Sequence, residues 1–292
     1  MTTGTNQGSA IVYGASGHGR VVADILQACG LEVEGFVDDD PLADRQASGL
    51  SILGNGEWLA EQGRRRPVAV ALGVGDNFDR HAIAKRCVTA GIRLLTAVHP
   101  SATIAPSAKI SAGVVIMAHA VVNADAMVGQ GAIINTGAIV EHDCCIGDFA
   151  HLSPRVAIGG HVQVGDGVNM GGLSAAQQFG RIGRYAFVSG LSGVTTDIIP
   201  YGIAIGLHVR LGGLNLIGLR RRKIPRENIH ALRAAYRAIF LDWDGSIQDN
   251  AKRAEGQWGK FPEVAEVIAF ILADAKRPIC PARRKGADSD EE

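Results

Sequence analysis

The chain has 292 residues, which suffices for two or three domains that each bury a core of their own. Its formal net charge is zero, its N-terminus lacks a basic start followed by an apolar run, and no stretch approaches the roughly 20 apolar residues of a membrane span. Five cysteines, an odd number without CxxC spacing, argue against a disulfide framework and a zinc knuckle. We therefore expect a cytoplasmic protein with no membrane span and no nucleic-acid partner.

The sequence of residues 1–97 predicts a small Rossmann-like βαβ domain. An apolar run, AIVY, leads into the glycine turn GASGHG, which opens a helical pattern. The next apolar run ends in Asp38, Asp39 and Asp40, about 20 residues after the first glycines. In this layout phosphates lie against the turn and the helix N-terminus, and an acid reaches the ribose or the base. We expect a nucleotide-binding domain, but the glycine spacing differs from GxGxxG and does not favour a dinucleotide oxidoreductase.

From Val98 the sequence repeats every six residues. Of 17 consecutive hexads, 15 begin with Val, Ile or Leu, and the other two begin with Met170 and Ala176. An aliphatic residue at every sixth position, with small residues at the corners, is typical of a hexapeptide β-helix with about 18 residues per triangular coil. We predict a left-handed parallel β-helix over residues 98–206, in which positions one coil apart stack on each other.

The hexad pattern then ends, and residues 207–280 predict a loop followed by amphipathic helices that begin near Pro225 and Pro262, an α-helical C-terminal domain. Residues 200–285 contain 16 Lys or Arg against 8 Asp or Glu. This excess of positive charge indicates either an anionic partner or a solvated basic surface. Residues 281–292 end in the acidic stretch GADSDEE and are predicted to form a disordered tail.

The motif EHDC places His142 between two carboxylates. Stacking by one coil predicts a column of Asp125, Asp143 and His161. It also puts Gly160 directly above His142, which should leave room there for a substrate. An imidazole held by a carboxylate is fixed in one tautomer and suits general-base abstraction of a proton from an amine or a hydroxyl. The N–H of Gly160 could meet the oxyanion that develops on a thioester carbonyl. We therefore predict His142, Asp143 and Gly160 as the catalytic residues.

Other interpretations of the histidines stay open. A histidine on a corner of a β-helix can be merely solvated, and a trimeric β-helix could serve as a scaffold without catalysis. Zinc could also bind between the chains of a trimer. The available side chains would be His119, His142, His151 and His161. The β-helical carbonic anhydrases use a His-x4-His pair among their zinc ligands, and the sequence contains no such pair, so we predict no metal site.

The first two regions resemble the PglD/NeuD-type nucleotide-sugar N-acyltransferases. The matching motifs are GASGHG and FVDDD, followed in the hexad region by VHPSA, NADA, INTGAIVEHDC and IGDFAHLSP. The resemblance implies that His142 is the base and that Asp143 orients it. It places Asn135 beside the sugar and His151 at acetyl-CoA. The nucleotide-sugar site that it implies consists of Gly14, Ser16, Gly17, His18, Gly19, Asp38 and Asp39.

From EHDC onward the sequence resembles LpxA, the UDP-N-acetylglucosamine O-acyltransferase of lipid A synthesis. The matching stretches include GGHVQVGD, GGLSAAQQFGRIG, VSGLSGVTTDIIPYGIAIGLH and GLNLIGLRRRKIPRENIHALRAAYRAIF. This resemblance implies that the Gly160 amide contacts the oxyanion and that Gly190 sets the acyl-chain length. The acyl-donor and nucleotide site that it implies consists of His161, Gln178, His208, Asn215 and Arg221.

The LpxA pattern is broken at Ile139, Gln177 and Ile217, which replace a histidine, a histidine and an acid. These departures favour the N-terminal domain as the nucleotide site. The sequence thus predicts a homotrimeric acyltransferase without a bound cofactor. It would move an acyl group from acyl-CoA or acyl carrier protein to the amino group of a nucleotide-linked amino sugar, in surface polysaccharide or lipopolysaccharide synthesis. O-acylation of a UDP-sugar on the route to lipid A is the alternative.

Overall fold

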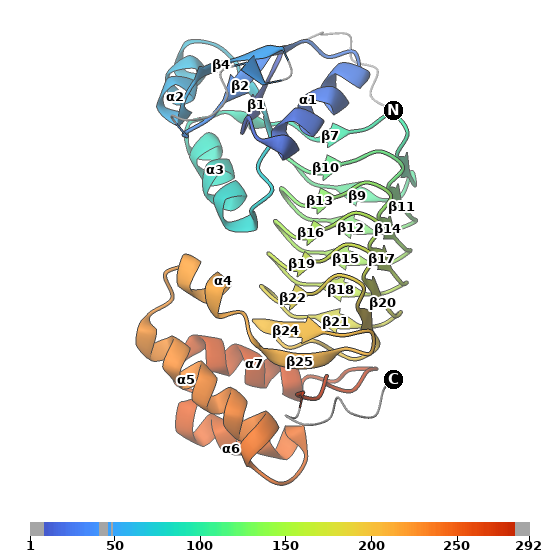
Figure 1. Ribbon diagram of the computed structural model, residues 1–292, viewed down its shortest axis with the longest axis vertical. Coiled ribbons are helices and arrows are strands. Elements are labelled where there is room, and N and C mark those ends of the chain that lie inside the picture. Colours follow the sequence, from blue (N-terminus) through green and yellow to red (C-terminus); the bar gives the residue numbers. More distant parts are fainter. Residues whose placement is uncertain (1–8, 41–45, 48, 284–292) are drawn as a thin grey trace.

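The computed structural model describes residues 9–40, 46–47 and 49–283, which form three regions along one long axis (Figure 1). An α/β region lies at one end, a parallel β-helix forms the middle, and a group of helices lies at the other end. The predicted combination of an N-terminal α/β region with a parallel β-helix is confirmed. Within the described residues, no helix combines the length and the apolar character that crossing a bilayer requires.

The N-terminal region is built on a six-stranded sheet in the order β3-β4-β2-β1-β5-β6. All four residues of the central strand β1 are buried, which explains why it is apolar throughout instead of alternating. After β1 the chain turns so tightly that a Cβ on Gly19 would lie 1.8 Å from the Gly14 oxygen. Only glycine lets helix α1 pack this closely on the turn.

The elements of this region are β1 (Ala10–Tyr13), α1 (Gly17–Ala28), β2 (Val33–Val37), β3 (Gln46–Ala47), β4 (Leu50–Gly54), α2 (Gly56–Arg65), β5 (Ala69–Leu72), α3 (Asn77–Thr89) and β6 (Arg93–Leu94).

The β-helix consists of two-residue strands in three parallel sheets. Val115 pairs with Ile133, and Ile133 pairs with His151, so each strand stacks on the strand one coil of 18 residues later. The aliphatic residue that begins each hexad points inward, and Val122 and Val140 are fully buried. The predicted stacking of positions one coil apart is confirmed, because burying one aliphatic side chain per hexad requires that register.

The first sheet contains β7 (Ala97–Val98), β10 (Val115–Ile116), β13 (Ile133–Ile134), β16 (His151–Leu152), β19 (Asn169–Met170) and β22 (Phe187–Val188), and it ends in the antiparallel hairpin of β24 (Gly202–Ile205) and β25 (Arg210–Leu214). The second contains β8 (Thr103–Ile104), β11 (Val121–Val122), β14 (Ile139–Val140), β17 (Ala157–Ile158), β20 (Ala175–Ala176) and β23 (Gly193–Val194). The third contains β9 (Lys109–Ile110), β12 (Met127–Val128), β15 (Cys145–Ile146), β18 (Gln163–Val164) and β21 (Arg181–Ile182).

The corner between the second and third sheets carries a column of non-glycine residues in the left-handed backbone region. Asp125, Asp143, His161 and Phe179 have φ values from 59° to 65°. This conformation is unfavourable for residues with a Cβ, so the surrounding structure must hold it. Hydrogen bonds between coils do so: the N–H of His161 donates to the His142 carbonyl at 3.0 Å, and the N–H of Phe179 donates to the Gly160 carbonyl at 2.9 Å. The side chains of the column therefore stack along one edge of the prism.

The C-terminal region packs its helices against the last coils in one continuous core. Its helices are α4 (Leu216–Arg221), α5 (Arg226–Arg237), a π-helical turn (Ala238–Asp242), α6 (Ile247–Trp258) and α7 (Pro262–Leu272). Helices α5 and α7 begin at the two prolines where the sequence predicts helices, whereas α4 lies in the predicted loop and α6 has no counterpart in the prediction. Of the predicted tail, residues 281–283 pair with Leu211 in β25, and residues 284–292 lie outside the described residues.

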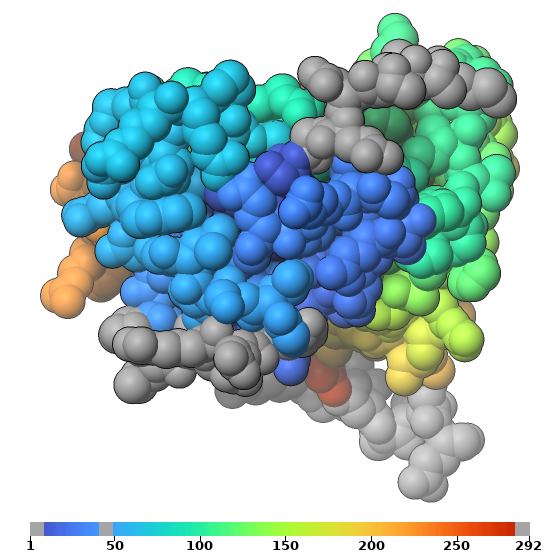
Figure 2. Space-filling view, turned by 90° about the horizontal axis from the view of Figure 1, so that it is seen from above, coloured from blue at the N-terminus to red at the C-terminus, as the bar shows by residue number. Residues whose placement is uncertain are grey.

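The N-terminal region lies against one side of the β-helix (Figure 2). Helix α1 packs on the first sheet, where Val115 and Ile133 are fully buried beneath it. Arg80 of α3, itself fully buried, donates to the carbonyls of Gly131 at 2.7 Å and Phe149 at 2.9 Å, at the corner between the third and first sheets. Its guanidinium also donates to the Gly75 carbonyl. Buried donors and acceptors are costly to leave unpaired, so these bonds fix the α/β region on the coils.

Candidate active site

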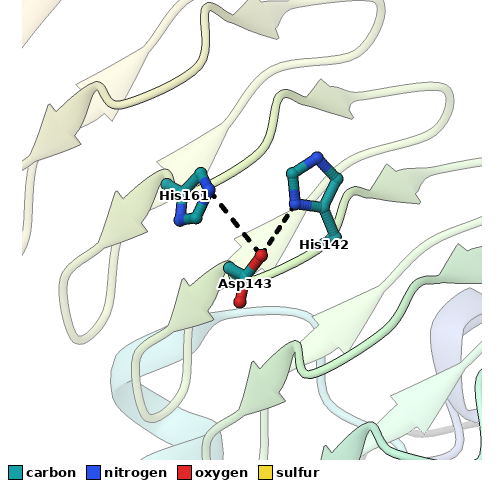
Figure 3. Close-up of side chains that lie close together, drawn as sticks. All are labelled: His142, Asp143 and His161. Carbon is teal, nitrogen blue, oxygen red and sulfur yellow. Dashed lines mark hydrogen bonds and ion pairs between the residues drawn. The ribbon is translucent and has the colours of Figure 1, made fainter.

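The turn between β14 and β15 places His142 and Asp143 on the outside of the corner between the second and third sheets. His161 lies one coil further along (Figure 3). The Asp143 Oδ2 atom lies 2.8 Å from His142 Nδ1 and 3.7 Å from His161 Nε2. All three side chains are about half exposed, at 44–53%. The structure thus brings together the two predicted catalytic side chains and one predicted donor-binding residue.

The contact with Asp143 determines which nitrogen of His142 is available for chemistry. An ionised carboxylate only accepts hydrogen bonds, so Nδ1 carries the proton and Nε2 keeps its lone pair. The other flanking acid, Glu141, accepts from Asn123 Nδ2 at 2.9 Å instead. The arrangement suits a general base that takes its proton at Nε2.

The sequence suggested that Gly160 leaves room for a substrate above His142. The structure shows no such room. The imidazole itself fills that space, because a Cβ built on Gly160 would lie 2.7 Å from His142 Cε1 and 2.8 Å from Nε2. Coils in a parallel sheet lie only about 4.8 Å apart, so a ring stacked on the next coil needs a glycine there. Within the part of the chain that the structure describes, the Gly160 N–H has no hydrogen-bond acceptor.

The ligand atoms of His142, Asp143 and His161 all lie within 4.8 Å of one another, so the three could hold a metal ion. Histidine and carboxylate ligands are those that zinc accepts. The short contact of Asp143 is with His142 Nδ1, however, and this bond would have to break for both groups to bind a metal.

A second group of predicted residues lies where α1 meets the first sheet. The rings of His18 and His151 are 6.4 Å apart, and Asn135 Nδ2 lies 3.2 Å from His151 Nε2. Burial, followed by the nearby Arg80 cation, lowers the pKa of His18 to about 4 and that of His151 to about 4. Both rings are therefore neutral at neutral pH. One neutral cluster thus contains Asn135 and His18, which are predicted to bind the nucleotide sugar, and His151, which is predicted to bind the acyl donor.

The predicted nucleotide site is a cavity of about 760 Å³ between the glycine turn and α3. Gly14, Ser16, Asp38 and Asp39 line it, whereas Gly17, His18 and Gly19 do not. Gly19 instead supports the close packing of the turn, and His18 lies in the cluster with His151.

The two predicted acids in this cavity differ in what they already bind. Asp39 accepts from Tyr13 Oη at 2.8 Å, from Arg86 at 2.7 Å and from the Gly56 N–H at 2.8 Å. These donors lower the pKa of Asp39 against the opposing effect of burial, while burial and the Asp39 carboxylate raise the pKa of Tyr13. Asp38 accepts the Ala15 N–H and so shapes the turn.

Sequence reasoning missed two cations of the cavity, Arg20 and Arg86. Arg20 follows GASGHG directly, on the first turn of α1, and that position beside a phosphate-binding turn was a usable signal. Arg86 lies in the last turn of α3, and only the fold brings it across to Asp39.

The residues that the LpxA resemblance assigns to the acyl donor lie in different places. Gln178 neighbours the column of His161 and Phe179, whereas Gly190 and His208 are exposed elsewhere on the β-helix. Asn215 caps α4, and Arg221 pairs with Asp76 of the N-terminal region at 2.6 Å. These last two line a second cavity of about 370 Å³, next to α3.

Comparison with known proteins finds two families in one chain. Residues 9–87 match the PglD N-terminal domain, and residues 197–280 match domain 2 of UDP-N-acetylglucosamine O-acyltransferase. Curated relatives include the acyl-[acyl-carrier-protein]–UDP-N-acetylglucosamine O-acyltransferases of Rhizobium etli, 41% identical over 143 residues, and Agrobacterium fabrum, 42% identical over 144. Each match covers 49% of this chain, and the chain spans about half the length of these relatives, 52% and 53%.

Solved structures cover more of the chain. PerB from Caulobacter crescentus, in complex with CoA and GDP-perosamine, is 33% identical with a TM-score of 0.67, and the match covers 70% of this chain and 98% of that one. The acetyltransferase domain of PglB from Neisseria gonorrhoeae, in complex with acetyl coenzyme A, is 30% identical with a TM-score of 0.66 over 70% of this chain and 98% of that one. The chain belongs to the PglD-type N-acyltransferases. It differs from a plain PglD-type N-acyltransferase in its C-terminal segment, which is of the O-acyltransferase type.

The close approach of His142 to Gly160 makes a testable prediction. In Gly160→Ala the added methyl group must push the imidazole away from its position over the corner. Misplacing a catalytic group by about 1 Å can lower a rate about 100-fold, so we expect kcat for acyl transfer to fall 10- to 100-fold with the fold intact. The measurement is a steady-state assay alongside circular dichroism. Gly256→Ala is the control, since nothing lies within 4 Å of a Cβ there. An unchanged kcat in Gly160→Ala would contradict the assignment.

The neutral cluster of His18 and His151 predicts how stability depends on pH. Their pKa values are about 4 when folded and about 6.5 when unfolded, so between these values the unfolded chain binds more protons. Stability should therefore fall as the pH drops from about 7 towards 4, by about 2–3 kcal/mol for each histidine. Urea unfolding at several pH values measures this slope. Gln at both positions should flatten it, whereas His230→Gln, at an exposed position of α5, should not. The prediction is refuted if the double variant loses stability with falling pH as steeply as the native protein does.

Proposed function

We propose that the protein transfers an acyl group from a coenzyme A or acyl carrier protein thioester to the amino group of a nucleotide-linked amino sugar. The observation that carries this proposal is the His142–Asp143 pair, in which the contact at Nδ1 leaves Nε2 of His142 for chemistry, on the β-helix of a chain that also holds a nucleotide-sized cavity. The similarity to PerB, whose structure contains CoA and GDP-perosamine, supports it. Surface polysaccharide or lipopolysaccharide synthesis is the setting that such a substrate implies.

The proposed reaction uses His142 twice. The neutral amine of the sugar attacks the thioester carbonyl, the C–N bond forms, and Nε2 of His142 takes the proton that the nitrogen loses. The Gly160 N–H stabilises the oxyanion of the tetrahedral intermediate. When the C–S bond breaks, the imidazolium returns the proton to the departing sulfur, which leaves as a thiol. Asp143 stays ionised and stabilises the imidazolium between these steps.

The proposed active site lies between chains of a homotrimer of left-handed β-helices. The nucleotide cavity belongs to the region docked at the corner between the third and first sheets, whereas His142 lies at the corner between the second and third sheets, one full prism face away. The second sheet exposes uncharged, mostly small side chains that suit packing against a copy of itself. These are Thr103, Val121, Ile139, Ala157, Ala175 and Gly193.

The alternative of O-acylation of a UDP-sugar is favoured by one specific observation. Residues 197–280 match the O-acyltransferase family, and Asn215 and Arg221 of that segment line the second cavity. In the free chain, however, Arg221 is paired with Asp76 of the N-terminal region. An N-terminal region of this kind also supplies a nucleotide cavity of its own, so we place the nucleotide there and expect N-acylation.

The function is tested by offering UDP-, GDP- and dTDP-linked amino sugars and UDP-N-acetylglucosamine together with acetyl-CoA, 3-hydroxyacyl-CoA and acyl carrier protein thioesters. Mass spectrometry should find an amide on an amino sugar. We expect His142→Ala to lower the rate by about 2 to 4 decades, the size of a lost general base. Activity should survive EDTA, because no metal takes part in the proposed steps. An ester product, or full activity in His142→Ala, would overturn the proposal.

The site between chains is tested by mixing two impaired variants. Asp38→Ala damages the cavity and His142→Ala removes the base, and each should have little activity at an acceptor concentration far below KM. If a site takes the cavity of one chain and the base of its neighbour, mixed trimers of equal amounts should recover about a quarter of the native activity. Mixtures of each variant with itself are the controls. If the mixed trimers show no recovery, the whole site lies within one chain.

A further inference from the structure

The segment after α7, residues 273–283, returns from the helices to the β-helix, and we name it the C-terminal strap. Its Ile279 bridges to Asp197, and Ala282 bridges to Leu211 in β25. Nearer α7, the Arg277 guanidinium donates twice to the Gln178 carbonyl, at 2.9 and 3.1 Å, and once to Gln177 Oε1 at 2.9 Å. The strap is thus tied down beside the coil that follows the one bearing His161.

These anchors bring Lys276 to the column that contains the candidate catalytic carboxylate. Its ammonium nitrogen lies 3.9 Å from the centroid of the Phe179 ring. Phe179 in turn stacks on His161, with centroids 4.8 Å apart and an angle of 8° between the planes. An imidazole that covers one face at this distance leaves the opposite face of the phenyl ring for the ammonium. Lys276, Phe179 and His161 therefore form a continuous stack.

The stack ends at the His142–Asp143 pair. The rings of His142 and His161 meet edge to face, at 5.2 Å and 90°. Asp143 Oδ2 makes its hydrogen bond to His142 Nδ1 at 2.8 Å, while His161 Nε2 stays at 3.7 Å, beyond hydrogen-bonding distance. A small rotation of His161 would bring its Nε2 into competition for the same oxygen atom. The orientation of His161 thus decides whether Asp143 keeps its hydrogen bond to His142 undisturbed.

One physical effect of Lys276 opposes that competition. A cation over a phenyl ring is attracted to the face of the ring and holds it in place. A ring that is held in place also holds the imidazole stacked on its other face.

We propose that Lys276 is a positioning residue for the acyl transfer, acting through Phe179 and His161 on the Asp143–His142 pair. This inference rests on the proposed function of His142. It links the C-terminal region, which is of the O-acyltransferase type, to the chemistry at the β-helix corner. Lys276 touches no substrate in this role, so its effect falls on the chemical step and not on binding.

The experiment compares Lys276→Met, which keeps the apolar stem, with Lys276→Arg, which restores the cation. We expect Lys276→Met to lower kcat about three- to tenfold, with both KM values unchanged, and Lys276→Arg to recover most of the loss. The matched control is Lys260→Met. It removes another lysine–phenyl contact, the one with Phe261 at 5.2 Å, which lies between α6 and α7 and outside the C-terminal strap. In a Phe179→Leu background, Lys276→Met should have no further effect, because the intermediary ring is gone.

A second, spectroscopic measurement of the His161 ring does not depend on enzyme activity. In protein with 13C-labelled histidine, the His161 ring signal, identified with His161→Asn, should move in Lys276→Met and return in Lys276→Arg. If the native chain acylates no amino sugar, the proposed function fails while this measurement still decides whether Lys276 orients His161. An unmoved His161 signal overturns the inference. A rise in KM alone, or an effect that persists in the Phe179→Leu background, also overturns it.

Discussion

The aliphatic side chain at every sixth position is stable only when it is buried away from water. The chain buries three such side chains per coil by turning a corner after each hexad, which makes a triangular prism. This stacking of coils places residues 18 positions apart directly over one another, as the pairing of Ile133 with His151 shows. At the corner between the second and third sheets it also forces a residue with a Cβ into the left-handed backbone region on successive coils. The Asp143 carboxylate lies beside His142 because of this constraint, and Gly160 is required by the same close spacing.

A second constraint fixes the α/β region on this prism. Arg80 makes five hydrogen bonds and has no exposed surface. Three of its acceptors belong to α3 or to the loop before it, and two belong to coils of the β-helix. Since the loss of any of these partners would leave a buried guanidinium unpaired at a high cost in free energy, the cavity proposed for the nucleotide keeps one orientation relative to the coils. This cavity and His142 are therefore held on one rigid frame.

The histidines of the β-helix show how position decides chemistry. His142 is about half exposed and bonded to a carboxylate, which makes it suitable for accepting and returning a proton. His151 is only one half-coil further along the chain but points under α1, where burial and the Arg80 cation lower its pKa to about 4. It can donate or accept a hydrogen bond as a neutral ring, but its lowered pKa makes it a poor base near pH 7. Two histidines nine residues apart in the sequence therefore have different capacities.

The sequence by itself determined the parallel β-helix, the register of one coil, the α/β region before it and the neighbourhood of His142 and Asp143. It could do so because a six-residue period and a glycine turn are local patterns, and stacking converts sequence spacing directly into distance. The open space expected above His142 did not exist, because a one-dimensional pattern shows that a glycine is present but not which neighbour fills the gap.

Tertiary structure alone decided the contacts between regions. The contact of His18 with His151, the pairing of Arg221 with Asp76, and the contact of Lys276 with Phe179 all join residues whose separation in sequence follows no period. Such contacts arise when whole elements dock, and docking depends on the summed burial of many side chains, which no short motif records.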